Sequence, residues 1–207
     1  MAIFNRKNHW ENIYQTKGQQ EVSWHQAKPE TCLNLIINSG MPLTAKIIDV
    51  GGGDGFLVDF LLESGYTDIT VLDISAAAIE KARLRLGDKA NDVKWIVSDI
   101  TDFKPAEKYD IWHDRAAFHF LLDDNDINTY TKIVSENINR DGVLIVGTFS
   151  EKGPKKCSGI DIKQYSEAAL TAQFEKDFIK TDALTENHKT PFDTFQHFVF
   201  CIFRKRN

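Results

Sequence analysis

The sequence is poor in cysteine, and the cysteines that it has are far apart. Cys32, Cys157 and Cys201 form no Cys-x-x-Cys pair, so we expect neither a disulfide framework nor a zinc site. No stretch approaches the roughly 20 consecutive apolar residues that span a bilayer, and the first ten residues lack the apolar run of a signal peptide. These absences predict a cytoplasmic protein with no bound metal and no membrane partner.

A surplus of basic residues is also lacking. Lys and Arg number 25 against 30 Asp and Glu, which gives a formal net charge of −5. That is the wrong sign for a surface that neutralises nucleic-acid phosphates, so we expect no nucleic-acid partner. The 207 residues contain no linker and no repeat, and their number fits one domain. We expect a single domain over 1–207, with N-terminal helices over 1–45 and a core over 46–207, and we make no prediction of the oligomeric state.

Short apolar runs alternate with helical patterns from residue 46 onward, which indicates a parallel sheet with helices on both faces. The predicted strands lie at 47–50, 69–72, 93–97, 109–112 and 143–149, and the predicted helices at 9–17, 29–38, 56–64, 75–86, 127–138 and 166–174. Two further strand-like runs, 178–184 and 195–203, follow each other directly and imply an antiparallel hairpin. The predicted fold is α/β, a doubly wound, seven-stranded and mostly parallel sheet with a C-terminal antiparallel hairpin.

A glycine-rich loop, 49–55, joins the first predicted strand to the helix that follows it. An open α/β sheet presents its ligand crevice at this point, and four glycines in five residues are more than a turn needs. In the dinucleotide fingerprint Gly-x-Gly-x-x-Gly counted from Gly51, the third glycine position is Phe56, and Asp54 would repel a pyrophosphate. The loop therefore predicts a ligand other than a dinucleotide, and it disfavours a nicotinamide-dependent dehydrogenase.

An acid follows each of the next two predicted strands. Asp73 lies about 20 residues after Gly51, the spacing at which an acid meets the ribose of an adenine nucleotide. Its alternative role is to cap the helix that begins near Ser75. Asp99 lies at the same sheet edge, where it can receive an adenine amino group or start the turn at Thr101.

The loop Asp-x-Gly-x-Gly-x-Gly, the two acids and the terminal hairpin together resemble the Rossmann-like (class I) S-adenosylmethionine-dependent methyltransferases over roughly residues 46–207. The resemblance implies S-adenosylmethionine as the cofactor and methyl transfer as the activity. In that family the loop lies against the methionine and sugar, the second acid holds the ribose and the third contacts adenine, with the first acid facing the methionine amine. The implied cofactor-binding residues are Asp49, Gly51, Gly52, Gly53, Gly55, Asp73, Ile74, Asp99, Ile100 and His113.

A polar segment, 112–119, follows the fourth predicted strand at the same sheet edge. If it turns helical, Arg115 and His119 lie four residues apart on one face. We predict His113, Asp114, Arg115 and His119 as catalytic; the alternative is a solvated ion pair of Asp114 or Arg115 with a core-facing His119. The segment also resembles runs in thiopurine-type small-molecule methyltransferases and in certain protein-lysine methyltransferases. Both a small molecule, which we favour, and a protein therefore stay open as acceptor.

Aromatic residues are dense in the N-terminal segment. We predict that Trp24 lids the site and covers a sulfonium by cation–π contact, and that Trp10 packs. Lys152, Lys155 and Lys156 either form a rim that admits a small anionic acceptor or lie in a solvated loop. A module that binds the cofactor without catalysis is the non-enzymatic alternative.

Overall fold

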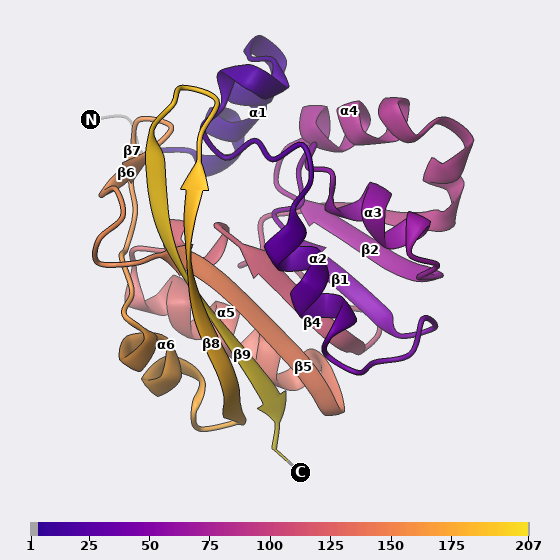
Figure 1. The fold of residues 1–207 in the computed structure, drawn as a ribbon, viewed down its shortest axis with the longest axis vertical. Coiled ribbons are helices and arrows are strands. Elements are labelled where there is room, and N and C mark those ends of the chain that lie inside the picture. The colour runs from indigo at the N-terminus through magenta and orange to yellow at the C-terminus, as the bar shows by residue number, and fades with distance from the viewer. Residues whose placement is uncertain (1–3, 207) are drawn as a thin grey trace.

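The computed structural model describes residues 4–206. Ahead of the sheet lie helix α1 (Arg6–Thr16), the 3₁₀ turn η1 (Gln19–Glu21) and helix α2 (Glu30–Ile37) (Figure 1). The remaining elements are β1 (Lys46–Val50), α3 (Leu57–Glu63), β2 (Asp68–Asp73), α4 (Ala76–Leu86), η2 (Gly87–Asp92), β3 (Val93–Val97), β4 (Tyr109–Arg115), η3 (Phe118–Phe120), α5 (Asp124–Asn137), β5 (Ile138–Phe149), β6 (Lys156–Cys157), β7 (Ile160–Asp161), α6 (Glu167–Phe174), β8 (Phe178–Lys189) and β9 (Phe195–Lys205). None of the described helices is long and apolar enough to cross a membrane.

The main sheet has seven strands in the order β3-β2-β1-β4-β5-β9-β8. The first five strands are parallel, and β9 is antiparallel to both of its neighbours. The predicted sheet and C-terminal hairpin are therefore confirmed. The chain moves outward from β1 to β3 and then resumes on the other side of β1 with β4, so the sheet has a switch point between β1 and β4 where ligands bind in open α/β folds.

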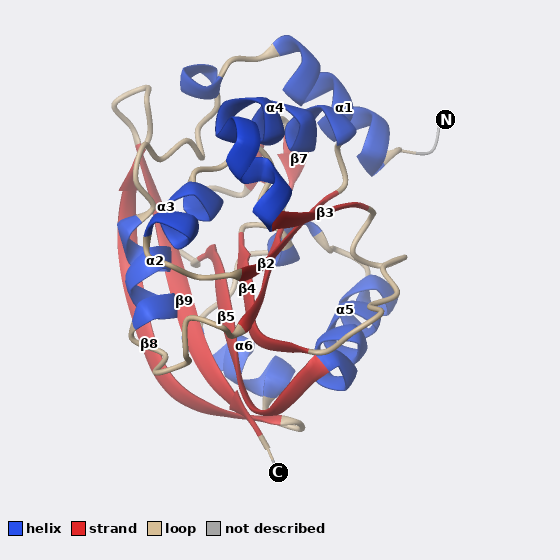
Figure 2. Cartoon of the chain, turned by 90° about the vertical axis from the view of Figure 1, so that its right-hand side faces the viewer, coloured by secondary structure: helices blue, strands red, loops and turns tan. Residues whose placement is uncertain are grey.

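Helices cover both faces of the sheet because the strand residues alternate between two apolar cores. On β5, Val143 and Ile145 belong to the core under α2 and α3, whereas Leu144 and Val146 belong to the core under α5 and α6. Figure 2 shows α2 and α3 on one side of the sheet and α5 on the other. A strand buried on both faces reads as an unbroken apolar run, which is the pattern of this segment.

Strand β4 is longer than its apolar run. We expected it to end at Trp112, but Asp114 pairs with Val50 of β1 and Arg115 pairs with Gly147 of β5. The segment does not turn helical as a whole, so Arg115 and His119 share no helix face: Arg115 ends the strand and His119 lies in the separate 3₁₀ turn η3. The extra strand residues carry polar side chains to the carboxyl edge of the sheet.

A buried polar chain joins β4 to α5. The Trp112 indole donates to the Tyr130 hydroxyl at 3.2 Å, and that hydroxyl donates to the Asp114 carboxylate at 2.7 Å. All three side chains are buried. Removing one partner of a buried hydrogen bond leaves the other unsatisfied, at a cost of about 1–3 kcal/mol.

We expect Tyr130→Phe to lower the free energy of unfolding by about 1–3 kcal/mol, since it leaves the Trp112 donor and the Asp114 acceptor without their shared partner. Urea denaturation of the purified chain measures the change. Tyr165→Phe is the matched control, because the Tyr165 hydroxyl is buried but has no hydrogen-bond partner among residues 4–206. Equal losses in the two variants would show that the polar chain contributes nothing of its own.

Candidate functional site

A large cleft lies at the carboxyl ends of β1, β2 and β4. It is open to solvent on one side and encloses about 1280 Å³ when that open space is included. The predicted site residues that line it are Trp24, Asp49, Gly51, Gly52, Gly55, Asp73, Ile74, Asp99, Ile100, His113 and Arg115. The cleft thus brings together most of the residues that were predicted from the sequence.

The glycine loop forms the floor of the cleft, and two of its glycines have positive φ, +70° at Gly51 and +55° at Gly53. The Gly51 amide donates to the Leu72 carbonyl at 2.7 Å, which ties the loop to the end of β2. Gly53 lies behind the lining: a Cβ there would stand 2.5 Å from the Tyr14 hydroxyl and 3.3 Å from the Asp73 carboxylate. From outside, the Arg85 guanidinium donates to the loop carbonyls of Asp54 and Gly55. The loop is therefore held by hydrogen bonds from both sides, with no room for a side chain at Gly53.

Asp73 ends β2 at the wall of the cleft. One carboxylate oxygen accepts from the Ser75 amide at 2.8 Å, but the N-cap of α4 is Ser75, whose hydroxyl accepts from Ala78. Burial, together with the neighbouring Asp54 and Asp49 carboxylates, raises the pKa of Asp73 to about 7. A buried carboxylate in this state is stabilised by any ligand that donates hydrogen bonds to it.

His113 and Asp49 form a buried pair across the switch point. Their strands align them in register, and the His113 Nδ1 lies 2.7 Å from an Asp49 oxygen. Burial alone would lower the pKa of His113, but the nearby Cys32 thiol and the hydrogen bond to Asp49 raise it to about 10. The raised pKa favours the protonated ring beside the Asp49 carboxylate, and the Nε2 of His113 has no partner among the described residues.

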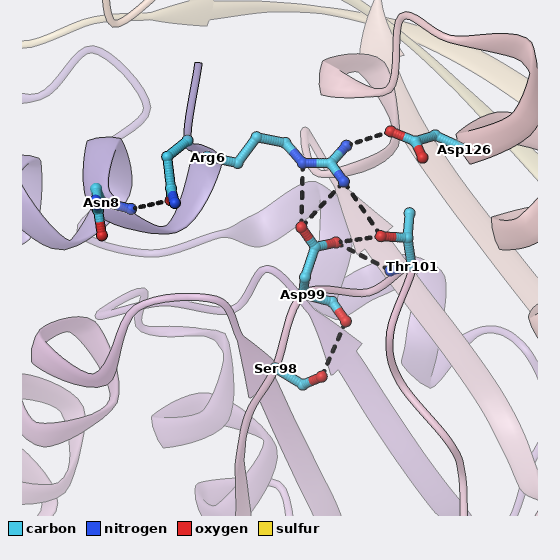
Figure 3. A network of polar contacts seen from close by, with 7 residues as sticks. Arg6, Asn8, Ser98, Asp99, Thr101 and Asp126 are labelled. Atoms are coloured by element: carbon cyan, nitrogen blue, oxygen red, sulfur yellow. Dashed lines mark hydrogen bonds and ion pairs between the residues drawn. The ribbon is translucent and has the colours of Figure 1, made fainter. Parts of the chain in front are cut away.

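Asp99 carries the ion pair that holds the start of α1 over the cleft (Figure 3). The Arg6 guanidinium contacts Asp99 at 3.0 Å and Asp126 of α5 at 2.7 Å, and it donates to the Thr101 hydroxyl at 3.1 Å. Asp99 also accepts from the Thr101 amide at 3.0 Å, as the turn alternative predicted. One helical turn further along α1, Glu11 accepts from the Ser75 hydroxyl at 2.8 Å. These contacts fix α1 at two ends of the cleft.

Two predicted catalytic residues lie outside the cleft. Asp114 points to the opposite core, where it accepts from the amides of Ala117 and Phe118 at 2.9 and 3.1 Å and so shapes the turn after β4. His119 is fully buried and accepts from the Phe149 amide at 3.2 Å. Burial, with the charge of Arg115, lowers the pKa of His119 to about 3, so the ring is neutral. The structure places both side chains in the scaffold, as the core-facing alternative for His119 expected.

Aromatic side chains form the far wall of the cleft, beyond the glycine loop. Trp10 makes edge contacts with Trp24 and Phe120, with ring centroids 5.6 and 4.9 Å apart, and Tyr14 contacts Trp24 at 6.1 Å. All four side chains line the cleft. Trp10 thus packs, as predicted, but against this aromatic cluster at the cleft, and the cluster provides a flat apolar surface for a second ligand.

Several lining residues were missed from the sequence, among them Arg6, Phe120, Cys32 and Cys157. Arg6 bonds to a residue 93 positions away, and no local pattern predicts such a contact. Phe120 has the plainest signal, since it follows the polar segment directly. Among the described residues no group of three His, Cys, Asp or Glu side chains is arranged to hold a metal ion.

The donors and acceptors of the cleft fit the cofactor that the resemblance implies. Asp73 and Asp49 supply acceptors for ribose hydroxyls and an amine, the unpartnered Nε2 of His113 supplies a donor, and the glycine loop leaves its backbone accessible. Such a mixture of opposite charges suits a ligand that carries both signs better than a polyanion.

Comparison with known proteins agrees with this geometry. A family model described as a methyltransferase domain matches residues 47–142. The malonyl-(acyl-carrier protein) O-methyltransferase 1 of Ilyobacter polytropus is 28% identical over 189 residues, which are 90% of this chain and 67% of that protein. The eEF1A lysine and N-terminal methyltransferase of Mus musculus is 23% identical over 131 residues, which are 63% of this chain and 18% of that protein. The chain therefore spans two thirds of the bacterial relative but under a fifth of the mouse relative.

Among solved structures, the N-methyltransferase NodS from Bradyrhizobium japonicum, in complex with S-adenosyl-L-homocysteine, has a similar fold. The TM-score is 0.77 at 16% identity, over 98% of this chain and 100% of that chain. At this identity the likeness concerns the fold alone.

Asp73→Asn should have opposite effects on stability and on ligand binding. The pKa of Asp73 in the folded chain lies above the ordinary aspartate value of 3.8. Ionising Asp73 therefore costs stability, and this cost grows from about pH 4 to about pH 7 and is complete above about pH 7. We expect the variant to melt at least about 2 °C higher at pH 8, the shift that ~1 kcal/mol produces in a chain of this size. The gain should shrink as the pH falls toward 5.

The same substitution should weaken binding of S-adenosylhomocysteine by roughly 1.5–3 kcal/mol, the value of one charge-assisted hydrogen bond. Thermal melts and calorimetric titration supply the two measurements, with the exposed Asp102→Asn as control. A variant that is less stable and still binds normally would show that Asp73 has only a structural role.

Proposed function

The chain belongs to the class I S-adenosylmethionine-dependent methyltransferase family, and from this premise we propose that it transfers the methyl group of S-adenosylmethionine to a small molecule held against the aromatic wall of the cleft. The proposed cofactor end comprises Asp49, Asp73 and the glycine loop. The proposed acceptor end comprises Arg115 and the aromatic wall.

When bound, S-adenosylmethionine supplies an electrophilic methyl carbon: a lone pair of the acceptor forms the new bond, and the electron pair of the carbon–sulfur bond returns to sulfur, leaving a neutral thioether. The chain's contribution to such a displacement is alignment of the two reactants and exclusion of water. Asp73 would fix the ribose, and the His113–Asp49 pair would orient the methionine end. His113, a cation already bonded to Asp49, positions groups rather than accepting a proton.

The roof over the cleft is the observation that favours a small acceptor. Ion pairs of Arg6 hold α1 in place over the cleft. The roof is lined by residues of α1 and of the segment that follows it, namely Trp10, Tyr14, Val22, Trp24, His25 and Gln26. A lysine side chain of a folded protein would have to enter beneath this roof. The relatives are named for both kinds of acceptor, a malonyl group on a carrier protein and a lysine of eEF1A, so a protein acceptor is the second candidate.

We also propose a cytoplasmic location, which three free cysteines fit.

Transfer of a labelled methyl group tests the proposal. The purified chain is incubated with methyl-labelled S-adenosylmethionine and a cell extract divided by ultrafiltration into small-molecule and protein fractions. We expect label to enter a product of the small-molecule fraction. Label confined to protein would favour the second candidate, and absence of S-adenosylhomocysteine binding would contradict the proposed function altogether.

Two glycine substitutions make a matched pair of controls for this assay. Gly53 and Gly87 both have positive φ, +55° and +58°, so alanine strains the backbone at each position. Alanine at Gly53 meets Tyr14 and Asp73 at the cleft, whereas nothing lies within 4 Å of a Cβ at Gly87. Gly53→Ala should therefore lose cofactor binding and label transfer, and Gly87→Ala should retain both.

A further inference from the structure

Arg115 lines the cleft and forms no ion pair with any residue of 4–206. Its residue is half-buried at the end of β4, and its guanidinium lies over the Phe198 ring, 4.5 Å from the centroid. Only Nη1 has a hydrogen-bond partner, the Trp24 carbonyl at 3.5 Å. The nitrogens Nε and Nη2 are closed off from solvent and have no partner within residues 4–206. A side chain that lines the cleft thus carries two strong donors for which residues 4–206 provide no acceptor.

The two unpartnered nitrogens lie on one edge of the guanidinium. Their N–H groups are parallel, and this edge matches the two oxygens of a carboxylate. A desolvated donor without a partner is costly, and burial lowers the pKa of Arg115. A ligand oxyanion in the cleft would supply the missing acceptors.

The nearest anions of the chain do not fill that role. Glu186 of β8 influences Arg115 through its charge, but the two form no ion pair, and one Glu186 oxygen instead accepts from Gln26 at 3.3 Å. Asp49 is bonded to His113. These negative neighbours favour a ligand with one negative charge over one with two, since each further charge adds repulsion.

The lysines expected at the rim do not supply an anion site. Lys152, Lys155 and Lys156 are exposed and do not line the cleft, and Lys156 contacts Asp161 at 3.3 Å. The positive charge available to an acceptor is therefore inside the cleft, next to the aromatic wall.

We propose that Arg115 selects the methyl acceptor, and that this acceptor is a small monoanion whose carboxylate binds the Nε–Nη2 edge while its flat or apolar part lies along Trp10, Trp24 and Phe120. The proposal deepens the proposed function and rests on it, because it names the class of acceptor for the same cleft. Arg115 recognises the acceptor and is not required for the cofactor.

Calorimetric titration of the full chain saturated with S-adenosylhomocysteine tests the proposal. Benzoate, the smallest probe with a flat apolar part and a carboxylate, is compared with its neutral counterpart benzamide and with inorganic phosphate. We expect benzoate to bind at least about tenfold more tightly than either. Only benzoate has both a carboxylate to accept from Nε and Nη2 of Arg115 and a flat ring to pack on the aromatic wall.

Substitutions at Arg115 and Glu186 then test whether Arg115 causes the preference for benzoate. Arg115→Met and Arg115→Lys should each lose about tenfold or more in benzoate affinity, since the first removes the charge and the second removes the fork. Glu186→Gln should bind benzoate as well as the parent or better, because it removes a nearby negative charge. All variants should bind S-adenosylhomocysteine like the parent, which also shows that they are folded.

The possible results test the role of Arg115 separately from the proposed methyl transfer. Equal binding of benzoate and benzamide, binding of phosphate alone, or unchanged benzoate affinity in Arg115→Met would overturn the assignment of Arg115. Failure of the parent to bind S-adenosylhomocysteine would instead contradict the proposed methyl transfer itself.

Discussion

Burial of three carboxylates around the glycine loop is the constraint on which the cleft depends. Asp49, Asp54 and Asp73 are all buried there, and burial, with the charges of Asp54 and Asp49, raises the pKa of Asp73. The protein offsets this charge locally: His113 bonds to Asp49, and Arg85 reaches the loop from outside. The residual strain is relieved by a ligand that donates hydrogen bonds and carries positive charge. Ribose hydroxyls, an amine and a sulfonium meet that requirement together.

The second organising feature is the alternation of side chains along β4. His113 and Arg115 face the cleft, while Asp114 between them faces the opposite core and shapes the turn that follows. Strand β4 thus carries both the cleft residues and the core residue that shapes the turn, because successive strand residues point to opposite faces. Trp112 and Tyr130 extend the support into α5. A change on the core side of β4 would therefore move the two cleft residues even though it touches no ligand.

The sequence predicted the sheet and its hairpin, because these follow from apolar periodicity, and most of the residues that it singled out line the cleft. It failed where β4 was ended too early. With the strand extended to Arg115, its period of two would have separated Asp114 from His113 and Arg115. The contacts of Arg6 with Asp99 and Asp126 join residues 93 and 120 positions apart, and only the folded chain reveals them. The sequence also could not show that Nε and Nη2 of Arg115 lack hydrogen-bond partners, since that depends on which residues the fold brings close to them.

The most direct test of this account is a crystal structure of the chain with S-adenosylhomocysteine. The account predicts the ribose hydroxyls within hydrogen-bond distance of the Asp73 carboxylate, the adenine beside Asp99 and Ile100, and the sulfur facing the space between the aromatic wall and Arg115. A nucleoside bound outside the glycine loop, or a sulfur turned away from the aromatic wall, would contradict it.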